Sequence, residues 1–97
     1  MKKLLFFHAP WCPPCRFYER QFIVPLKCEV GEDKIQCVNA QNEPFMADKY
    51  NVDKLPTVVL LDGETVHMNR TGAIDINKVA AWLKGGKDEV QKRSGAI

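Results

Sequence analysis

The sequence predicts an α/β fold in which strands and helices alternate before a closing hairpin and helix. Three observations carry this prediction: an apolar run near the start, helical patterns between the later apolar runs, and Asp62-Gly63 between two alternating segments. The expected element order is β-α-β-α-β-β-α. Its βαβ beginning favours parallel pairing and its hairpin antiparallel pairing, so we expect a four-stranded mixed sheet flanked by helices.

The first half of the chain supplies two strands and a helix. Residues 3–7 form a short apolar run typical of a buried strand, and residues 13–24 continue with a helical pattern. We expect this helix to end near Val24, because Pro25 has no backbone N–H and clashes with the preceding helical turn. Residues 35–39 then alternate as a second strand.

A second helix and a hairpin follow. Residues 43–51 fit a helix with Asn42 as its expected N-cap and a proline in its first turn. Residues 57–61 and 64–68 are the two strands around Asp62-Gly63, a dipeptide that strongly indicates a hairpin turn.

Asp75 is the expected N-cap of the last helix, whose apolar residues recur at helical spacing. We expect an interruption at Gly85-Gly86, a continuation through Lys92, and fraying over residues 93–97. On this part of the chain, His67 is expected at the surface and Trp82 against an apolar edge.

Length and composition predict one domain over residues 1–97. The chain has 97 residues, of which 45% are hydrophobic and 27% charged, enough for a single core. The net charge of +2 is spread over interspersed acidic and basic residues, which argues against nucleic acid as a partner. The apolar run at residues 4–7 is too short for a signal peptide or a membrane span. We therefore expect a cytoplasmic monomer that does not bind membranes.

Trp11-Cys12-Pro13-Pro14-Cys15 places two thiols where the first strand gives way to the first helix. At the helix N-terminus the dipole stabilises a Cys12 thiolate by ~0.3–1 kcal/mol and lowers the pKa of that thiol. Cys15 lies one turn into the helix, from where it can attack a mixed disulfide formed at Cys12. Pro13 and Pro14 support this site, since proline suits the first turn of a helix. The pattern predicts a reversible dithiol–disulfide couple.

Zinc binding by all four cysteines, Cys12, Cys15, Cys28 and Cys37, is an alternative that the spacing permits. The two prolines between the first pair cannot supply the backbone N–H groups that zinc knuckles turn toward their sulfurs. We therefore expect no metal, and Cys28 and Cys37 as reduced thiols outside the redox chemistry.

The chain resembles the thioredoxins over residues 4 to about 83. The resemblance is carried by the element order and by Ala9-Pro10-Trp11-Cys12-Pro13-Pro14-Cys15, Leu55-Pro56-Thr57 before the hairpin and Gly72 after it. It implies the thioredoxin fold and a cis peptide bond before Pro56. It also implies a substrate-binding rim beside the dithiol, made of Trp11, Leu55, Pro56, Thr71, Gly72 and Ala73.

The same resemblance implies the activity and the partners. A thioredoxin-like chain is a thiol-disulfide oxidoreductase that reduces protein disulfides by Cys12 attack and Cys15 resolution, with no bound cofactor. Its implied partners are disulfide-containing proteins and, as electron donor, a thioredoxin reductase that uses NADPH.

Two departures from the thioredoxin pattern concern proton transfer and architecture. The buried carboxylate that thioredoxins usually carry five positions before the active-site tryptophan is replaced by Phe6, and its lysine partner by Cys37. Cys15 is therefore expected to lose its proton more slowly, or to water, His8 or the departing thiolate. The sequence also starts at what would be the second strand of a thioredoxin, an architecture closer to the glutaredoxins.

Glutathione-dependent chemistry of the glutaredoxin kind is therefore an alternative function. Glutaredoxins generally have Tyr where this chain has Pro14, and a Thr-Val-Pro order where it has Leu55-Pro56-Thr57. Glutaredoxins also generally have acidic residues after the glycine that follows the second hairpin strand, and here Asp75 does follow Gly72 by three positions. These differences favour the thioredoxin interpretation.

Overall fold

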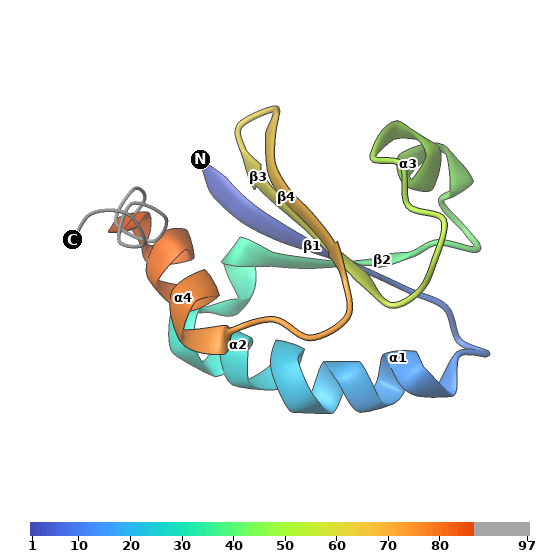
Figure 1. Cartoon of the computed structure of the whole chain (residues 1–97), viewed down its shortest axis with the longest axis horizontal. Helices are drawn as coiled ribbons and strands as arrows, with labels where there is room; N and C mark the ends of the chain where they lie inside the picture. Colours follow the sequence, from blue (N-terminus) through green and yellow to red (C-terminus); the bar gives the residue numbers. More distant parts are fainter. Residues whose placement is uncertain (87–97) are drawn as a thin grey trace.

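The computed structural model describes residues 1–86 and has an α/β architecture built on one four-stranded sheet (Figure 1). The strand order is β2-β1-β3-β4, with β1 parallel to β2 and antiparallel to β3, and β3 antiparallel to β4. The strands are β1 (Lys2–His8), β2 (Ile35–Asn39), β3 (Thr57–Asp62) and β4 (Thr65–Thr71). The predicted mixed sheet and element order are confirmed.

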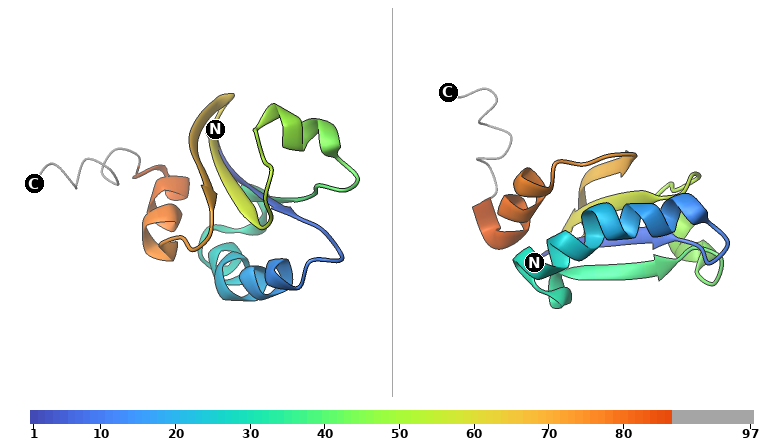
Figure 2. Two further views of the ribbon diagram at one scale, coloured as in Figure 1. Left: turned by 45° about the vertical axis from the view of Figure 1, so that its right-hand side comes forward. Right: turned by 90° about the horizontal axis from the view of Figure 1, so that it is seen from below.

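The helices cover both faces of this sheet (Figures 1 and 2). The long helical segment after β1 and the helix after β4 pack on one face, and the helix before β3 packs on the other. In chain order they are α1 (Pro13–Tyr18), the π-helical turn η1 (Glu19–Ile23), α2 (Val24–Val30), the short η2 (Glu32–Lys34), α3 (Pro44–Lys49), α4 (Ile76–Ala81) and the π-helical turn η3 (Trp82–Gly86).

The two central strands, β1 and β3, form the middle of the core. Successive side chains of a strand point to opposite faces. Leu4 and Phe6 accordingly pack under α1, α2 and α4, whereas Leu5 and Phe7 pack under α3. All four are buried, which explains why the start of the chain is a continuous apolar run rather than an alternating one.

The first helix runs farther than the sequence predicts. Pro25 does not end it near Val24, because α1, η1 and α2 follow one another without a break as far as Val30. Proline clashes with the carbonyl four residues earlier in a regular α-helix. Here the turn before it is a π turn, in which the Val24 N–H donates to the Glu19 carbonyl, so Pro25 occupies the first turn of a new α stretch.

The other helix ends differ by small amounts from the predictions. The N-cap of α3 is Glu43 and not Asn42, because the N–H groups of both residues donate to the Asn39 carbonyl in a tight turn after β2. Asp75 caps α4 as predicted, since its carboxylate accepts from the Lys78 N–H at 3.1 Å. Regular helix ends at Gly85, which has φ 101°. The predicted continuation through Lys92 and the predicted fraying of residues 93–97 lie outside the described residues.

No helix within residues 1–86 is long and apolar enough to cross a membrane.

Candidate active site

The two cysteines of the Cys-Pro-Pro-Cys motif lie where β1 ends and α1 begins, at the right of Figure 1. The loop from Ala9 turns the chain into the helix, and the Cys12 N–H donates to the Ala9 carbonyl at 3.2 Å. Cys12 is the N-cap of α1, as predicted, and Cys15 is the third helical residue. Both side chains are buried.

Cys12 and Cys15 form a disulfide, with Cα atoms 5.3 Å apart. The Cys15 N–H also points at the Cys12 sulfur, with N and Sγ separated by 3.2 Å. Pro13 and Pro14 have no N–H, so this is the first donor that the helix offers to the sulfur. A donor in this position favours negative charge on the Cys12 sulfur when the disulfide opens.

The segment before β3 packs against the dithiol. Leu55 is partly buried against a cluster made of Ala9, Cys12 and Cys15. The Leu55–Pro56 peptide bond is cis, as the resemblance implied. The structure therefore brings three predicted site residues, Cys12, Cys15 and Leu55, into one cluster, with Pro56 next to it in the chain.

Trp11 lies on the outer side of this cluster. Its side chain is 66% exposed, and its indole N–H donates to the Gln41 side-chain carbonyl at 2.8 Å. With Pro10, Pro13, Arg16 and Arg20 it lines a shallow hollow of about 370 Å³ beside the start of α1. An exposed indole fixed by a hydrogen bond offers a rigid apolar surface next to the disulfide.

The end of β4 and the loop after it carry the rest of the predicted rim, Thr71, Gly72 and Ala73. The Tyr18 hydroxyl donates to the Gly72 carbonyl at 2.8 Å, which ties this loop to the helix that carries the dithiol. The hydroxyl groups of Thr71 and Thr57 are hydrogen-bonded, with their oxygens 2.8 Å apart. The Thr57 hydroxyl donates to the Lys54 carbonyl. These contacts connect the loop to α1 and to the segment after Pro56.

Arg70 and Tyr18 complete the support of this loop. The Arg70 guanidinium donates to the Ala73 carbonyl at 3.3 Å. Burial raises the pKa of Tyr18 to about 12, and the positive charge of Arg70 partly opposes that rise. Tyr18 therefore remains a protonated donor to Gly72 at neutral pH.

Three of these supporting residues were not among the predicted site residues. Tyr18 fits the helical apolar pattern, so its spacing from Cys15 was a usable signal for packing. No sequence pattern pointed to Gln41 or Arg70. Gln41 accepts from a side chain 30 residues away, and Arg70 donates to a backbone carbonyl in a loop.

Phe6 fills the position where thioredoxins usually carry a buried carboxylate. It is 1% exposed, and its ring stacks on His8 and on Tyr18 at centroid distances of 5.3 and 5.7 Å. Cys37 is its register partner on β2. Although Cys37 is an exposed residue, partial burial raises the pKa of its thiol and nearby Lys27 lowers it in part, so Cys37 is an uncharged thiol at neutral pH.

Cys28 and Cys37 are exposed thiols outside any disulfide. Cys28 lies on α2 and Cys37 on β2, whereas the disulfide lies at the start of α1. Within residues 1–86, no three or more His, Cys, Asp or Glu side chains gather as metal ligands would, so the four cysteines do not converge on one point.

A family model described as thioredoxin matches residues 1–85. The chain belongs to the thioredoxin family. Among curated relatives, chloroplastic thioredoxin Y1 of Arabidopsis thaliana is 45% identical over 67 residues, which are 63% of this chain and 36% of the relative. Chloroplastic thioredoxin Y2 of the same plant is 35% identical over 86 residues, 84% of this chain and 48% of the relative. The chain spans less than half the length of these relatives.

Solved thioredoxin structures have the same fold as this family member. Thioredoxin-2 of the malaria parasite superposes with a TM-score of 0.72 at 25% identity, covering 87% of this chain and 82% of that one. The thioredoxin of Fasciola hepatica gives 0.70 at 25% identity, covering 86% and 78%. The predicted thioredoxin fold is confirmed.

Proposed function

We propose that this thioredoxin-family protein is a thiol-disulfide oxidoreductase that reduces disulfide bonds in other proteins. The observation that carries the proposal is the Cys12–Cys15 disulfide at the head of α1, packed against Leu55 in the loop before β3. A dithiol that closes to a disulfide in this way donates two electrons to a substrate disulfide, which is reduced to two thiols.

The reaction starts from the reduced protein. The Cys12 thiolate, which the Cys15 N–H favours, attacks one sulfur of the substrate disulfide and forms a mixed disulfide. The substrate bond breaks, and its second sulfur leaves as a thiolate that takes up a proton. Cys15 then loses its own proton and attacks the Cys12 sulfur. The mixed disulfide breaks, the protein disulfide forms, and the substrate has gained two electrons and two protons.

Among residues 1–86, no buried carboxylate is present to accept the proton of Cys15. Phe6 occupies that position, and its only aromatic neighbours are His8 and Tyr18 among the described residues. We propose that the departing substrate thiolate or water takes the proton, with His8 as the nearest imidazole along the chain. Resolution by Cys15, rather than attack by Cys12, is then the slow half of the cycle.

Substrates dock on the rim beside the dithiol. Trp11, Leu55 and Pro56 supply its apolar side, and Thr71, Gly72 and Ala73 supply backbone groups with which an extended chain can pair. We propose protein disulfides as the substrates and a thioredoxin reductase as the donor that returns the protein to its dithiol form. No bound cofactor takes part in this cycle.

We propose a reducing compartment as the site of action, and the cytoplasm in particular. The Arabidopsis relatives named above are described as chloroplastic, so the chloroplast is the competing compartment. Cell fractionation followed by immunoblotting distinguishes the two.

Two serine variants test the mechanism. Cys12→Ser removes the attacking sulfur, so we expect no reduction of insulin disulfides and no covalent adduct. Cys15→Ser retains attack but cannot resolve, so we expect mixed disulfides that survive non-reducing electrophoresis and disappear with dithiothreitol. Adducts trapped by Cys12→Ser instead would reverse the two roles, and a fully active Cys12→Ser protein would overturn the proposal.

A second assay separates this proposal from glutathione-dependent chemistry. With glutathione and its reductase as the only electron source, we expect slow reduction of a mixed-disulfide substrate. Asp75, the acidic residue that the glutaredoxin alternative relies on, already caps α4 through the Lys78 N–H. Rapid turnover with glutathione would favour the alternative.

A further inference from the structure

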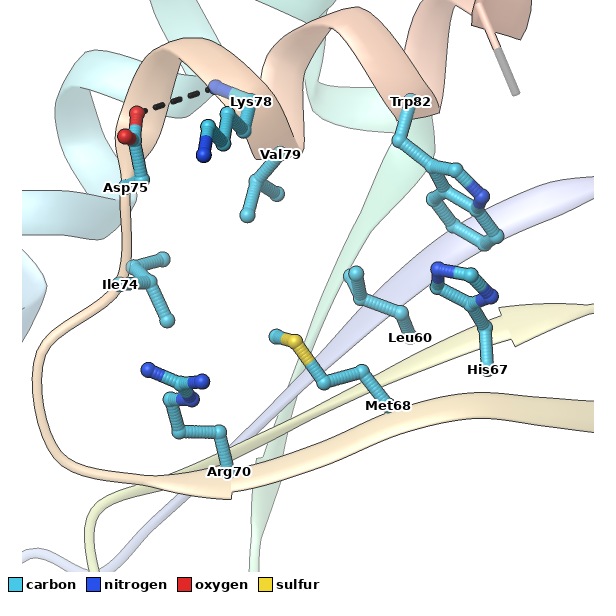
Figure 3. Close-up of a pocket in the computed structure, with 9 residues that line it drawn as sticks. All are labelled: Leu60, His67, Met68, Arg70, Ile74, Asp75, Lys78, Val79 and Trp82. Carbon is cyan, nitrogen blue, oxygen red and sulfur yellow. Dashed lines mark hydrogen bonds between the residues drawn. The ribbon is translucent and has the colours of Figure 1, made fainter. Parts of the chain in front are cut away.

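A second hollow lies between β4 and α4, apart from the dithiol (Figure 3). Its volume is about 270 Å³, just below the ~300–1,000 Å³ of typical small-molecule pockets. One wall comes from β4 and the other from α4 and the residues before it. The lining residues are Leu60, His67, Met68, Arg70, Ile74, Asp75, Lys78, Val79 and Trp82.

A β-bulge in the hairpin places His67 in this hollow. Leu60 is paired with Met68, but Leu61 is paired with Val66, so His67 is an extra residue in β4. A bulge of this kind re-aims a side chain toward the other face of a sheet. His67 consequently lies on the α4 side together with Met68, although strand alternation alone would separate these neighbours (Figure 3).

One end of the hollow is aromatic. The His67 ring stacks on Trp82 with a centroid distance of 4.6 Å and an interplanar angle of 15°. Trp82 is only 3% exposed, and the Lys2 ammonium lies 4.8 Å from the centre of its ring. Figure 3 shows the apolar side chains of Leu60 and Met68 between this pair and the end of the hollow that carries Arg70 and Lys78. The aromatic end therefore combines the buried Trp82 ring with the exposed His67 ring.

The opposite end carries two cations. Arg70 and Lys78 both line it, and the single carboxylate there, Asp75, already accepts the Lys78 backbone N–H. Arg70 gives one N–H to the Ala73 carbonyl, which leaves other guanidinium donors available. Among residues 1–86, neither cation forms an ion pair. With two cations and one carboxylate, this end of the hollow has a net positive charge.

We propose that this hollow binds small aromatic carboxylic acids. The ring of the ligand packs on Leu60, Met68 and Val79 beside the His67–Trp82 pair, and its carboxylate pairs with Arg70 and Lys78. The volume of about 270 Å³ admits one ring with a short acidic side chain. The site is separate from the dithiol, so its occupancy does not depend on the proposed oxidoreductase activity.

Nuclear magnetic resonance of the full ¹⁵N-labelled chain tests the proposal, because each of the two tryptophans reports on one site. Titration with 3-phenylpropionate should move the Trp82 indole N–H and the amides of β4 and α4 in a saturable way, while the Trp11 indole stays in place. The neutral 3-phenylpropan-1-ol and the ringless propionate should each bind at least about tenfold more weakly. Absence of saturation, equal binding of the alcohol, or movement of the Trp11 indole instead would overturn the proposal.

Matched lysine variants complete the test. Lys78→Gln should weaken 3-phenylpropionate binding at least about tenfold and leave binding of the alcohol unchanged. Lys84→Gln is the control, since Lys84 lies on η3 and pairs with Glu29 outside the hollow. Both proteins should give the dispersed spectrum of the parent chain. Equal affinity for the acid in the parent and in Lys78→Gln would contradict the assignment.

Discussion

Tyr18 is the side chain that joins the dithiol helix to the loop after β4. It lies one turn after Cys15, is buried among Phe6 and Phe22, and donates to the Gly72 carbonyl. Loss of the donor to this part-buried carbonyl is costly, because water replaces the lost partner only in part. Tyr18 therefore fixes the part of the rim on which a substrate chain would pair.

Replacing Tyr18 by Phe tests this role. The ring contacts persist, whereas the hydrogen bond to Gly72 is lost, so we expect the free energy of unfolding in urea to fall by ~1–2 kcal/mol. We also expect a lower kcat/KM for insulin reduction, because the rim is held less firmly. Tyr50→Phe is the control, since Tyr50 packs under α3 on the other face. Equal stability of Tyr18→Phe and the parent protein would contradict this role.

The difference between Tyr18→Phe and the parent protein should also depend on pH. The pKa of Tyr18 rises to about 12 in the folded protein from 10.0. As pH rises above 10, the unfolded chain loses this proton before the folded protein does, so unfolding becomes more favourable. The stability advantage of the parent chain is thus complete below pH 10 and shrinks between pH 10 and 12. Urea unfolding of both proteins across this range measures it.

Some site residues were predictable from spacing and others were not. Cys12 and Cys15 were, because a helix start and a four-residue motif fix both their distance and their roles. The hydrogen bonds of Tyr18 and Gln41 span 54 and 30 residues, and no local pattern encodes contacts of that range. The His67–Trp82 stack escaped prediction for a similar reason, since it depends on a bulge that the hairpin sequence does not reveal.

In the segment from α1 through η1 to α2, packing in the core overrides the local sequence signal for a helix end. Pro25 predicts a helix end, yet the π turn before it lets the segment continue and bring Leu26 into the core. Burial of Ile23 and Leu26, both 0% exposed, outweighs the local preference. Helix propensity was therefore sufficient to place the start of this element but not its end.

We expect the exposed side of α1 and η1 to set a preference among the proposed protein substrates. Arg16 and Arg20 are four residues apart, so they lie on one side of the helix, where they line the hollow beside Trp11. Two positive charges at the edge of a docking surface attract acidic chains and repel basic ones.

Charge reversal at these two arginines measures that preference. For a peptide disulfide flanked by glutamates, Arg16→Glu/Arg20→Glu should lower kcat/KM about tenfold at low ionic strength, and by less in 0.5 M salt of about 4 Å screening length. For a lysine-flanked peptide, the same variant should be faster than the parent protein.

A variant with the same change in net charge controls for long-range effects. Lys34→Glu/Lys49→Glu alters η2 and α3, which do not line the hollow. It should leave the ratio of the two rates near that of the parent protein. An equal shift in both double variants would assign the preference to net charge and not to the hollow.

The topology of the whole molecule followed from local patterns because its connections are short. The βαβ start and the hairpin each fix one kind of strand pairing, and together they leave little freedom for the sheet. Local patterns do not specify which side chains meet across the layers. For that reason the fold was predicted more completely than the support of the site.

The two edges of the sheet bear on the oligomeric state. β2 has five residues with Gln36 and Cys37 exposed, and the other edge strand, β4, presents mostly exposed polar side chains. The shortness of β2 and the polar side chains of β4 disfavour pairing with a second chain. We therefore expect the reduced protein to sediment as a monomer in dithiothreitol, and a dimer under those conditions would contradict this expectation.

Without reductant, the exposed thiols of Cys28 and Cys37 should give a disulfide-linked dimer that Cys28→Ser/Cys37→Ser abolishes.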